Sequence, residues 1–124
     1  MKFCWVTINV KDMEGSLKFY QDIVGLKINR RMKPMATTEI VFLGSEGTNT
    51  EVELIRNEKN DNPQYGKDIS MGFVVESIDK TIASLKEKGI TNMEGPFQPG
   101  PSVKFIYITD PNGCRIQFVE NLHS

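Results

Sequence analysis

The chain has 124 residues, with fifteen basic and sixteen acidic side chains and a net charge of -1. That length suffices for one domain with its own apolar core, and the balanced charge lacks the basic surface of nucleic-acid binders. No apolar run approaches the roughly 20 residues of a membrane span, and the first residues lack the apolar region of a signal peptide. We therefore expect a cytoplasmic protein with no nucleic-acid or membrane partner.

Residue types that commonly hold metals are scarce. The two cysteines, Cys4 and Cys114, lie far apart in the sequence, and the one histidine, His123, is the penultimate residue. Without a secretion signal, two buried reduced thiols are favoured over a disulfide. The single histidine near the end of the chain excludes a histidine-rich metal site inside the domain.

The first half of the chain predicts a strand, a helix and three more strands. β-Branched and aromatic residues indicate a strand over 3–10. Asp12 is a candidate N-cap for a helix that ends at Gly25. The apolar face of this helix is formed by Met13, Leu17, Tyr20 and Val24. The three further strands are predicted at about 26–33, 38–44 and 50–56.

The second half repeats this order after a polar linker at about 57–67. Its elements are a strand at 69–76, a helix from the cap Ser77 to Gly89, and strands at about 91–94, 103–109 and 114–120. Matching residues recur at a nearly constant offset of about 64 positions, which favours a duplicated unit. We therefore predict one domain over 1–124, with module one at about 1–57 and module two at about 68–124. A tight turn, Asp110-Pro111-Asn112-Gly113, is predicted to join the last two strands into a hairpin.

The alternation of side chains along each strand separates an apolar face from a mixed one. The apolar sets are expected to pack under the helices. Trp5, Glu53, Ser70 and Gln117 fall on the mixed face, at matching places in the two repeats. Because the only tryptophan lies there, a concave and covered face is favoured over a fully solvated one.

The chain resembles the vicinal-oxygen-chelate superfamily, which includes glyoxalase I, extradiol dioxygenases and bleomycin-resistance proteins. The resemblance rests on Val10-Lys11-Asp12, Ser16-Leu17-Lys18-Phe19-Tyr20, Gly25-Leu26, Val52-Glu53-Leu54 and Asp110-Pro111-Asn112-Gly113-Cys114-Arg115-Ile116-Gln117-Phe118. It implies an α+β fold of two tandem βαβββ modules, with mixed sheets forming a concave crevice and helices on the outer face.

Glyoxalase-type (lactoylglutathione lyase-like) members hold a divalent metal with four residues, one from the first and one from the fourth strand of each module. In this chain those positions fall on Trp5, Glu53, Ser70 and Gln117. Only Glu53 keeps the residue type of the family. The indole, hydroxyl and amide are poor replacements for histidine and carboxylate ligands, so we expect no metal and no other cofactor. Metal-dependent glyoxalase I or dioxygenase activity is therefore not expected.

Three hypotheses for these residues stay open. Trp5, Glu53, Ser70 and Gln117 can line a crevice that binds a small planar or cationic molecule. Trp5 can instead fill the vacated metal cavity as a core residue. Glu53 can also act as a general base in a lyase- or isomerase-type enzyme that works without metal. The resemblance further implies a homodimer, in which the modules pair within one chain or across two.

Overall fold

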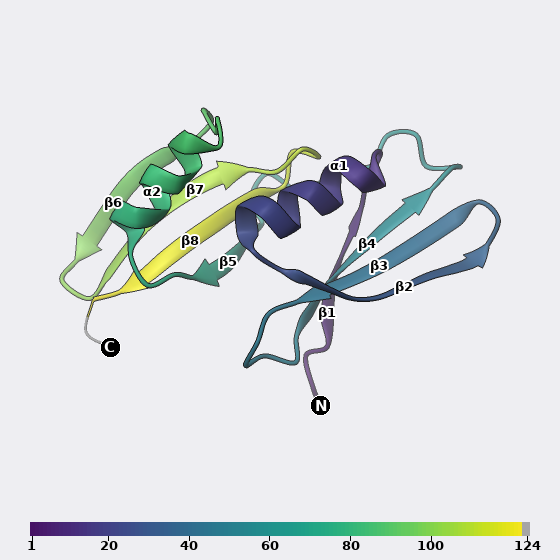
Figure 1. The fold of residues 1–124 in the computed structure, drawn as a ribbon, viewed down its shortest axis with the longest axis horizontal. Coiled ribbons are helices and arrows are strands. Elements are labelled where there is room, and N and C mark those ends of the chain that lie inside the picture. Colours follow the sequence, from purple (N-terminus) through teal and green to yellow (C-terminus); the bar gives the residue numbers. More distant parts are fainter. Residues whose placement is uncertain (123–124) are drawn as a thin grey trace. The chain divides into compact units, whose positions relative to one another are not determined.

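The computed structural model describes residues 1–122 and divides them into two compact α+β units (Figure 1). Unit 1 comprises Met1–Gln64, and unit 2 begins at Tyr65. Unit 1 contains β1 (Trp5–Asn9), α1 (Met13–Lys18), η1 (Phe19–Val24), β2 (Lys27–Met35), β3 (Thr38–Gly44) and β4 (Glu51–Asn57). Unit 2 contains β5 (Ser70–Val74), α2 (Ile78–Glu87), β6 (Glu94–Gly100), β7 (Val103–Thr109) and β8 (Arg115–Asn121).

Each unit is built on one four-stranded mixed sheet, and the two sheets have the same topology. The strand order is β1-β4-β3-β2 in unit 1 and β5-β8-β7-β6 in unit 2. In each sheet the first strand pairs parallel with the last one, and the other neighbours are antiparallel. This repeated arrangement confirms the predicted α+β fold with two βαβββ repeats.

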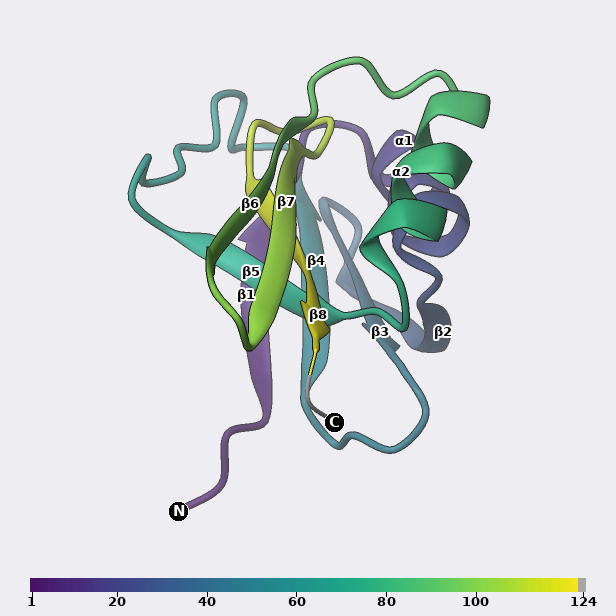
Figure 2. The same cartoon turned by 90° about the vertical axis from the view of Figure 1, so that its left-hand side faces the viewer.

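One helix covers one face of each sheet. Helix α1 packs on β4, and α2 packs on β7 and β8, which Figure 2 shows from the side. The predicted apolar sets face these helices and form the two cores. The buried strand residues on the helix side are Ile8, Val41, Leu43, Val52 and Leu54 in unit 1 and Met71, Ile106, Ile108, Ile116 and Phe118 in unit 2. Neither helix is long and apolar enough to cross a membrane, within the part of the chain that the structure describes.

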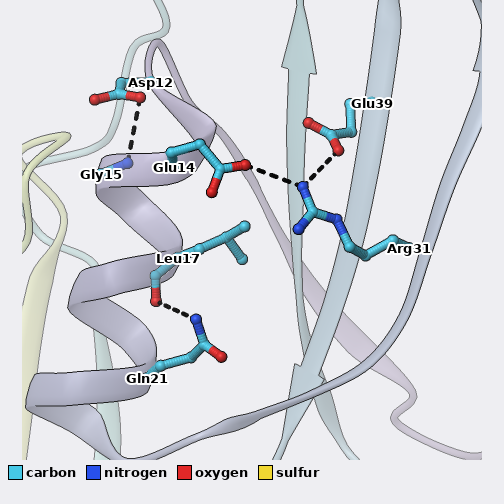
Figure 3. Close-up of polar contacts among 7 residues, drawn as sticks. All are labelled: Asp12, Glu14, Gly15, Leu17, Gln21, Arg31 and Glu39. Carbon is cyan, nitrogen blue, oxygen red and sulfur yellow. Dashed lines mark hydrogen bonds and ion pairs between the residues drawn. The ribbon is translucent and has the colours of Figure 1, made fainter.

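The first helix begins as predicted but changes its winding. The Asp12 side chain accepts a hydrogen bond from the Gly15 backbone N–H, as an N-cap does (Figure 3). From Phe19 the helix continues as a π-helix, in which both Phe19 and Tyr20 are buried. Gly25 then ends it with a left-handed backbone (φ 88°), which glycine adopts without a steric cost.

An arginine ties α1 to the edge of its sheet. Arg31 on β2 forms ion pairs with Glu14 on α1 (3.1 Å) and with Glu39 on β3 (2.7 Å), and Figure 3 shows it between the two carboxylates. Its hydrogen bonds to Glu39 and Glu14 raise the pKa of Arg31, so it stays charged. Arg31 and its two partners lie on the helix side of the sheet, so none of these charges is on the opposite face of unit 1.

The strand predicted at 91–94 is misplaced, because the observed strand β6 covers Glu94–Gly100. Its sequence contains Pro96 and Pro99, which lack the N–H group that a central strand needs. A segment with two prolines is therefore not predicted as a strand. The structure places β6 at the edge of the sheet, with register shifts against β7, and an edge strand tolerates proline.

The predictions for the two thiols hold for one of them. Both cysteines are free, and Cys114 is buried as expected. Cys4 is exposed, although the alternation pattern placed it on the apolar face. It precedes β1, and its carbonyl oxygen accepts a last hydrogen bond from the Glu51 N–H (2.9 Å), so it lies at the margin of the sheet, whereas Ile8 lies within it.

The predicted turn joins β7 and β8 into a hairpin. The buried Asp110 carboxylate accepts hydrogen bonds from the backbone N–H groups of Asn112 (2.9 Å) and Cys114 (2.7 Å). Gly113 takes a left-handed conformation with φ 94°. The aspartate thus holds the turn through its backbone donors, as Asx turns do.

Candidate functional site

The sheet face of unit 1 that points away from α1 carries a row of four aligned side chains. Arg30, Phe42, Glu53 and Thr7 are consecutive partners across β2, β3, β4 and β1. We call these four residues the Glu53 row. Side chains opposite one another in neighbouring strands lie about 5 Å apart, so the row forms a continuous strip across the sheet.

Glu53 is the most enclosed charge on this face. It is 8% exposed, and its Oε1 atom accepts a short hydrogen bond from the Thr7 hydroxyl. No lysine or arginine forms an ion pair with Glu53 within residues 1–122. A buried carboxylate is stabilised by charged donors far more than by a single hydroxyl, so Glu53 presents an uncompensated negative charge.

Trp5 lies on the same face, one pair of residues from Glu53. It is opposite Glu51 in the register of β1 and β4, and its ring meets the edge of Phe42 at a centroid distance of 5.2 Å. The side chain is 42% exposed. Trp5 is therefore not part of the core of unit 1.

The second carboxylate on the face, Glu51, is already neutralised. Arg30 donates two hydrogen bonds of 3.1 Å to its two oxygens, and Asn29 adds a third of 3.0 Å. The same guanidinium carbon lies 3.9 Å from the centroid of the Phe42 ring. No sequence motif marks Phe42, Glu51 or Thr7 as site residues. Alternation places Thr7 with Trp5 and Glu51 with Glu53, but only the register aligns the two strands.

Unit 2 carries the equivalent row with different chemistry. Glu94, Tyr107, Gln117 and Gly72 are consecutive partners across β6, β7, β8 and β5, and we call them the Gln117 row. Gln117 Nε2 donates a long hydrogen bond (3.4 Å) to the Tyr107 hydroxyl. A Cβ atom added at Gly72 would lie 3.2 Å from Gln117 Oε1, so the glycine leaves this amide uncovered. Ser70 is exposed on the same face, opposite Arg115.

The ion pairs beside the two rows have opposite polarity. In unit 1 the arginine is on β2 and the glutamate on β4; in unit 2 the glutamate, Glu94, is on β6 and the arginine, Arg115, on β8. The pair in unit 2 spans 3.3 Å, and the Arg115 guanidinium lies 3.7 Å from the Tyr107 ring centroid. The duplicated fold therefore keeps an arginine on an aromatic ring at each site but reverses the positions of the charges.

The residues with strongly shifted pKa values lie away from both rows. Burial raises the pKa of the Cys114 thiol to about 11, and the nearby Asp110 adds to the shift. Burial also raises the pKa of Tyr65 to about 12, with smaller contributions from Asp110 and Cys114. Both groups are neutral at physiological pH, so neither offers an ionised nucleophile.

The structure brings the four residues predicted from the sequence together in two pairs. Trp5 and Glu53 share a face in unit 1, and Ser70 and Gln117 share the equivalent face in unit 2. These positions supply one carboxylate, one indole, one hydroxyl and one amide. Within residues 1–122, no group of three or more His, Cys, Asp or Glu side chains is placed to hold a metal ion, and His123 lies outside the described residues.

Comparison with known proteins supports the family resemblance that the sequence shows. The family model for the Glyoxalase/Bleomycin resistance protein/Dioxygenase superfamily matches residues 2–118. A lactoylglutathione lyase of Haemophilus influenzae is 31% identical over 98% of this chain and 93% of its own length. The trypanothione-dependent glyoxalase I of Leishmania major superposes with a TM-score of 0.80 at 22% identity, covering 97% of this chain and 86% of that one.

Another solved structure with this fold is named for a different role. TnmS3, an antibiotic binding protein from Streptomyces sp. CB03234, shares the fold with a TM-score of 0.78 at 20% identity, covering 98% of this chain and 95% of that chain. Proteins named as lyases and a protein named as a binder thus share one fold, and the fold does not decide between these roles. With its repeated βαβββ units and a family match over nearly its whole length, the chain belongs to the Glyoxalase/Bleomycin resistance protein/Dioxygenase superfamily.

Proposed function

We propose that the protein binds a small planar or cationic molecule on the face of the unit 1 sheet that points away from α1, and that it does so without a metal. We call this face, which carries Trp5 and Glu53, the open face. The observation that carries the proposal is Glu53, a carboxylate 8% exposed with a hydroxyl but no cation as its partner among the described residues. A cationic ligand supplies the missing charge. The exposed indole of Trp5 beside it offers a surface for a flat ring or a cation.

The donor set does not fit the metal of the glyoxalase-type relatives. The indole nitrogen of Trp5 donates a proton and has no lone pair for coordination, and the Ser70 hydroxyl and Gln117 amide are neutral. A divalent ion would therefore meet one negative charge, from a carboxylate already engaged by Thr7. The protein is accordingly proposed to work without zinc, nickel, iron or manganese, and elemental analysis that found about one metal per chain, lost in Glu53→Gln, would contradict this.

Trp5 is the only tryptophan and serves as a built-in reporter of binding. Titration with planar aromatic cations is expected to change its fluorescence in a saturable way. Glu53→Gln removes the charge at nearly constant shape and is expected to weaken binding about tenfold or more. The matched control is Glu39→Gln, which alters a carboxylate of the same unit on the helix side of the sheet, where it pairs with Arg31. Equal affinity in all three proteins would overturn the proposal.

A second candidate is a lyase- or isomerase-type reaction with Glu53 as general base. It is favoured by the name of the Haemophilus influenzae relative and by the enclosed position of this carboxylate, which suits proton abstraction. The test is lactoylglutathione lyase activity measured in the presence of a chelator. Turnover that survives the chelator and disappears in Glu53→Gln would establish this candidate, whereas its absence with and without added zinc or nickel leaves the binding role.

We further propose that the protein is cytoplasmic and forms a homodimer. The homodimer is supported by apolar side chains that remain exposed along the edge strands and the segments before them. Phe3 is 67% exposed before β1, Ile69 is 65% exposed before β5, and Val74 at the end of β5 is 71% exposed. Unpaired sheet edges of this kind favour association with another chain. Light scattering at micromolar concentration is expected to give the mass of two chains, and the mass of one chain would contradict it.

A further inference from the structure

The open face of unit 1 carries a second row next to the Glu53 row, and this one is largely apolar. Met32, Ile40 and Ile55 are consecutive partners across β2, β3 and β4, and Asn9 of β1 ends the row. Each residue lies two positions along its strand from its neighbour in the Glu53 row, so it points to the same side. We call Met32, Ile40 and Ile55 the apolar row of unit 1.

The apolar row is accessible from the open face. Met32 is 40% exposed, and Ile40 and Ile55 are half-buried, whereas Val41 and Leu54 beside them point to the helix side and are fully buried. Three strands at about 4.8 Å spacing give the row a length of roughly 10 Å. The uncompensated carboxylate of Glu53 lies at one end of it, next to Ile55 along β4.

A carboxylate at one end of an apolar strip favours a ligand with a positive charge at one end and an apolar portion beside it. We propose that the ligand of unit 1 is an amphiphilic cation, whose ammonium or amidinium group pairs with Glu53 and whose apolar portion lies along Ile55, Ile40 and Met32. The inference rests on the proposed binding function and adds the class of ligand. The carboxylate selects the sign of the head group, and removal of apolar surface from water supplies affinity for the tail.

Unit 2 provides an internal comparison. Its equivalent apolar row is Phe97, Phe105, Val119 and Val74, again consecutive partners across the sheet. This row is wider and partly aromatic, but the neutral Gln117 stands where unit 1 has Glu53. It therefore offers apolar contact without the selection for a cation, and substitutions there serve as matched controls.

The experiment measures the affinity of n-alkylammonium ions of increasing chain length, from butyl upward, below the concentrations at which they form micelles. Trp5 fluorescence and calorimetry report binding, and n-alkylcarboxylates of the same lengths report the preference for charge. For the cations, Kd is expected to fall about two- to fourfold per added methylene group, and to stop falling once the chain exceeds the roughly 10 Å row. The carboxylates are expected to bind at least tenfold more weakly at each length.

Variants separate the two ends of the ligand. Met32→Gln and Ile55→Thr are both expected to flatten the dependence on chain length. Ile55 lies beside Glu53 on β4, so Ile55→Thr weakens binding from the shortest chains, whereas Met32→Gln acts only on chains that reach the far end of the row. Glu53→Gln is expected to abolish the preference for cations over carboxylates at every length. Val119→Thr, at the position in unit 2 that matches Ile55, is expected to change neither. Thermal unfolding of each variant confirms that it is folded.

The failures are distinguishable. If planar cations bind but chain length has no effect, or if Val119→Thr flattens the dependence as much as Ile55→Thr, the amphiphilic ligand is overturned and the proposed function stands. If neither a cation nor a neutral planar compound binds, the proposed function itself is overturned. Equal affinity of alkylammonium and alkylcarboxylate ions would show that Glu53 does not select the head group and would also overturn the inference.

Discussion

Unit 1 and unit 2 each place four residues in the equivalent row of their own sheet, yet the two rows carry different chemical groups. Glu53 and Thr7 of unit 1 correspond to Gln117 and Gly72 of unit 2. The first pair is a buried carboxylate with a hydroxyl donor, and the second is a neutral amide beside a glycine, which has no side chain. The comparison shows that a duplicated backbone fixes where side chains meet, while single substitutions decide the charge of each face.

The ion pairs show how such changes are tolerated. Arg30 and Glu51 exchange charge signs with Glu94 and Arg115 at the equivalent positions, and both arginines still stack on a ring. Exchanging both members of a pair keeps the attraction between them, because the interaction depends on the product of the charges. Exchanging one member alone would place like charges side by side.

The largest contrast is expected in the reactivity of the two thiols, one in each unit. Cys4 is exposed, whereas Cys114 is buried and has a pKa of about 11. At pH 8 only about one Cys114 thiol in a thousand is ionised, and the thiolate is the reacting form. Alkylation followed by mass spectrometry is therefore expected to label Cys4 at least a hundredfold faster. Comparable rates would show that unit 2 opens readily around its hairpin turn.

Core truncations compare the stability of the units. Leu54→Ala in unit 1 and Phe118→Ala in unit 2 remove buried side chains at equivalent positions, 0% and 2% exposed. We expect a loss of about 2–5 kcal/mol for Leu54→Ala and about 3–5 kcal/mol for Phe118→Ala in the free energy of unfolding. Urea denaturation followed by Trp5 fluorescence and by circular dichroism tests whether both probes shift together. Separate transitions would show that the units unfold independently.

The Thr7 hydroxyl, which is the partner of Glu53, is expected to matter more than the Tyr107 hydroxyl, which is the partner of Gln117 in unit 2. Thr7→Val leaves the Glu53 carboxylate buried without its donor, which costs about 1–3 kcal/mol of unfolding free energy. Tyr107→Phe removes the acceptor of a 3.4 Å hydrogen bond from Gln117, so we expect less than about 1 kcal/mol. Glu53→Gln in the Thr7→Val background should recover part of the loss, because it removes the buried charge. Equal costs for the two single variants would contradict the difference between the rows.

The smallest effect concerns the reversed ion pairs. Arg30→Glu alone is expected to cost about 1 kcal/mol, because it adds repulsion with Glu51 and removes the stacking on Phe42. The double variant Arg30→Glu/Glu51→Arg reproduces the polarity of unit 2, and we expect it to unfold within about 0.5 kcal/mol of the original protein. A double variant no more stable than Arg30→Glu would show that the polarity in unit 1 is fixed by other contacts.

The sequence by itself determined the order of the elements, their duplication and the faces of the strands. The period of two along each strand separated Val52 and Leu54 from Glu53, and the repeat at about 64 residues identified the duplication. Local signals were also sufficient at Asp12, Gly25 and the turn beginning at Asp110, because capping and turn geometry depend on a few consecutive residues.

Tertiary structure alone decided which residues share a row. Alternation places Thr7 and Trp5 on one face, but only the register of β1 against β4 sets Thr7 opposite Glu53 and Trp5 opposite Glu51. It likewise decided that β6 can contain prolines, because its place at the sheet edge leaves some N–H groups unneeded. Register and edge position arise from pairing between strands distant in sequence, and no short window of residues contains that information.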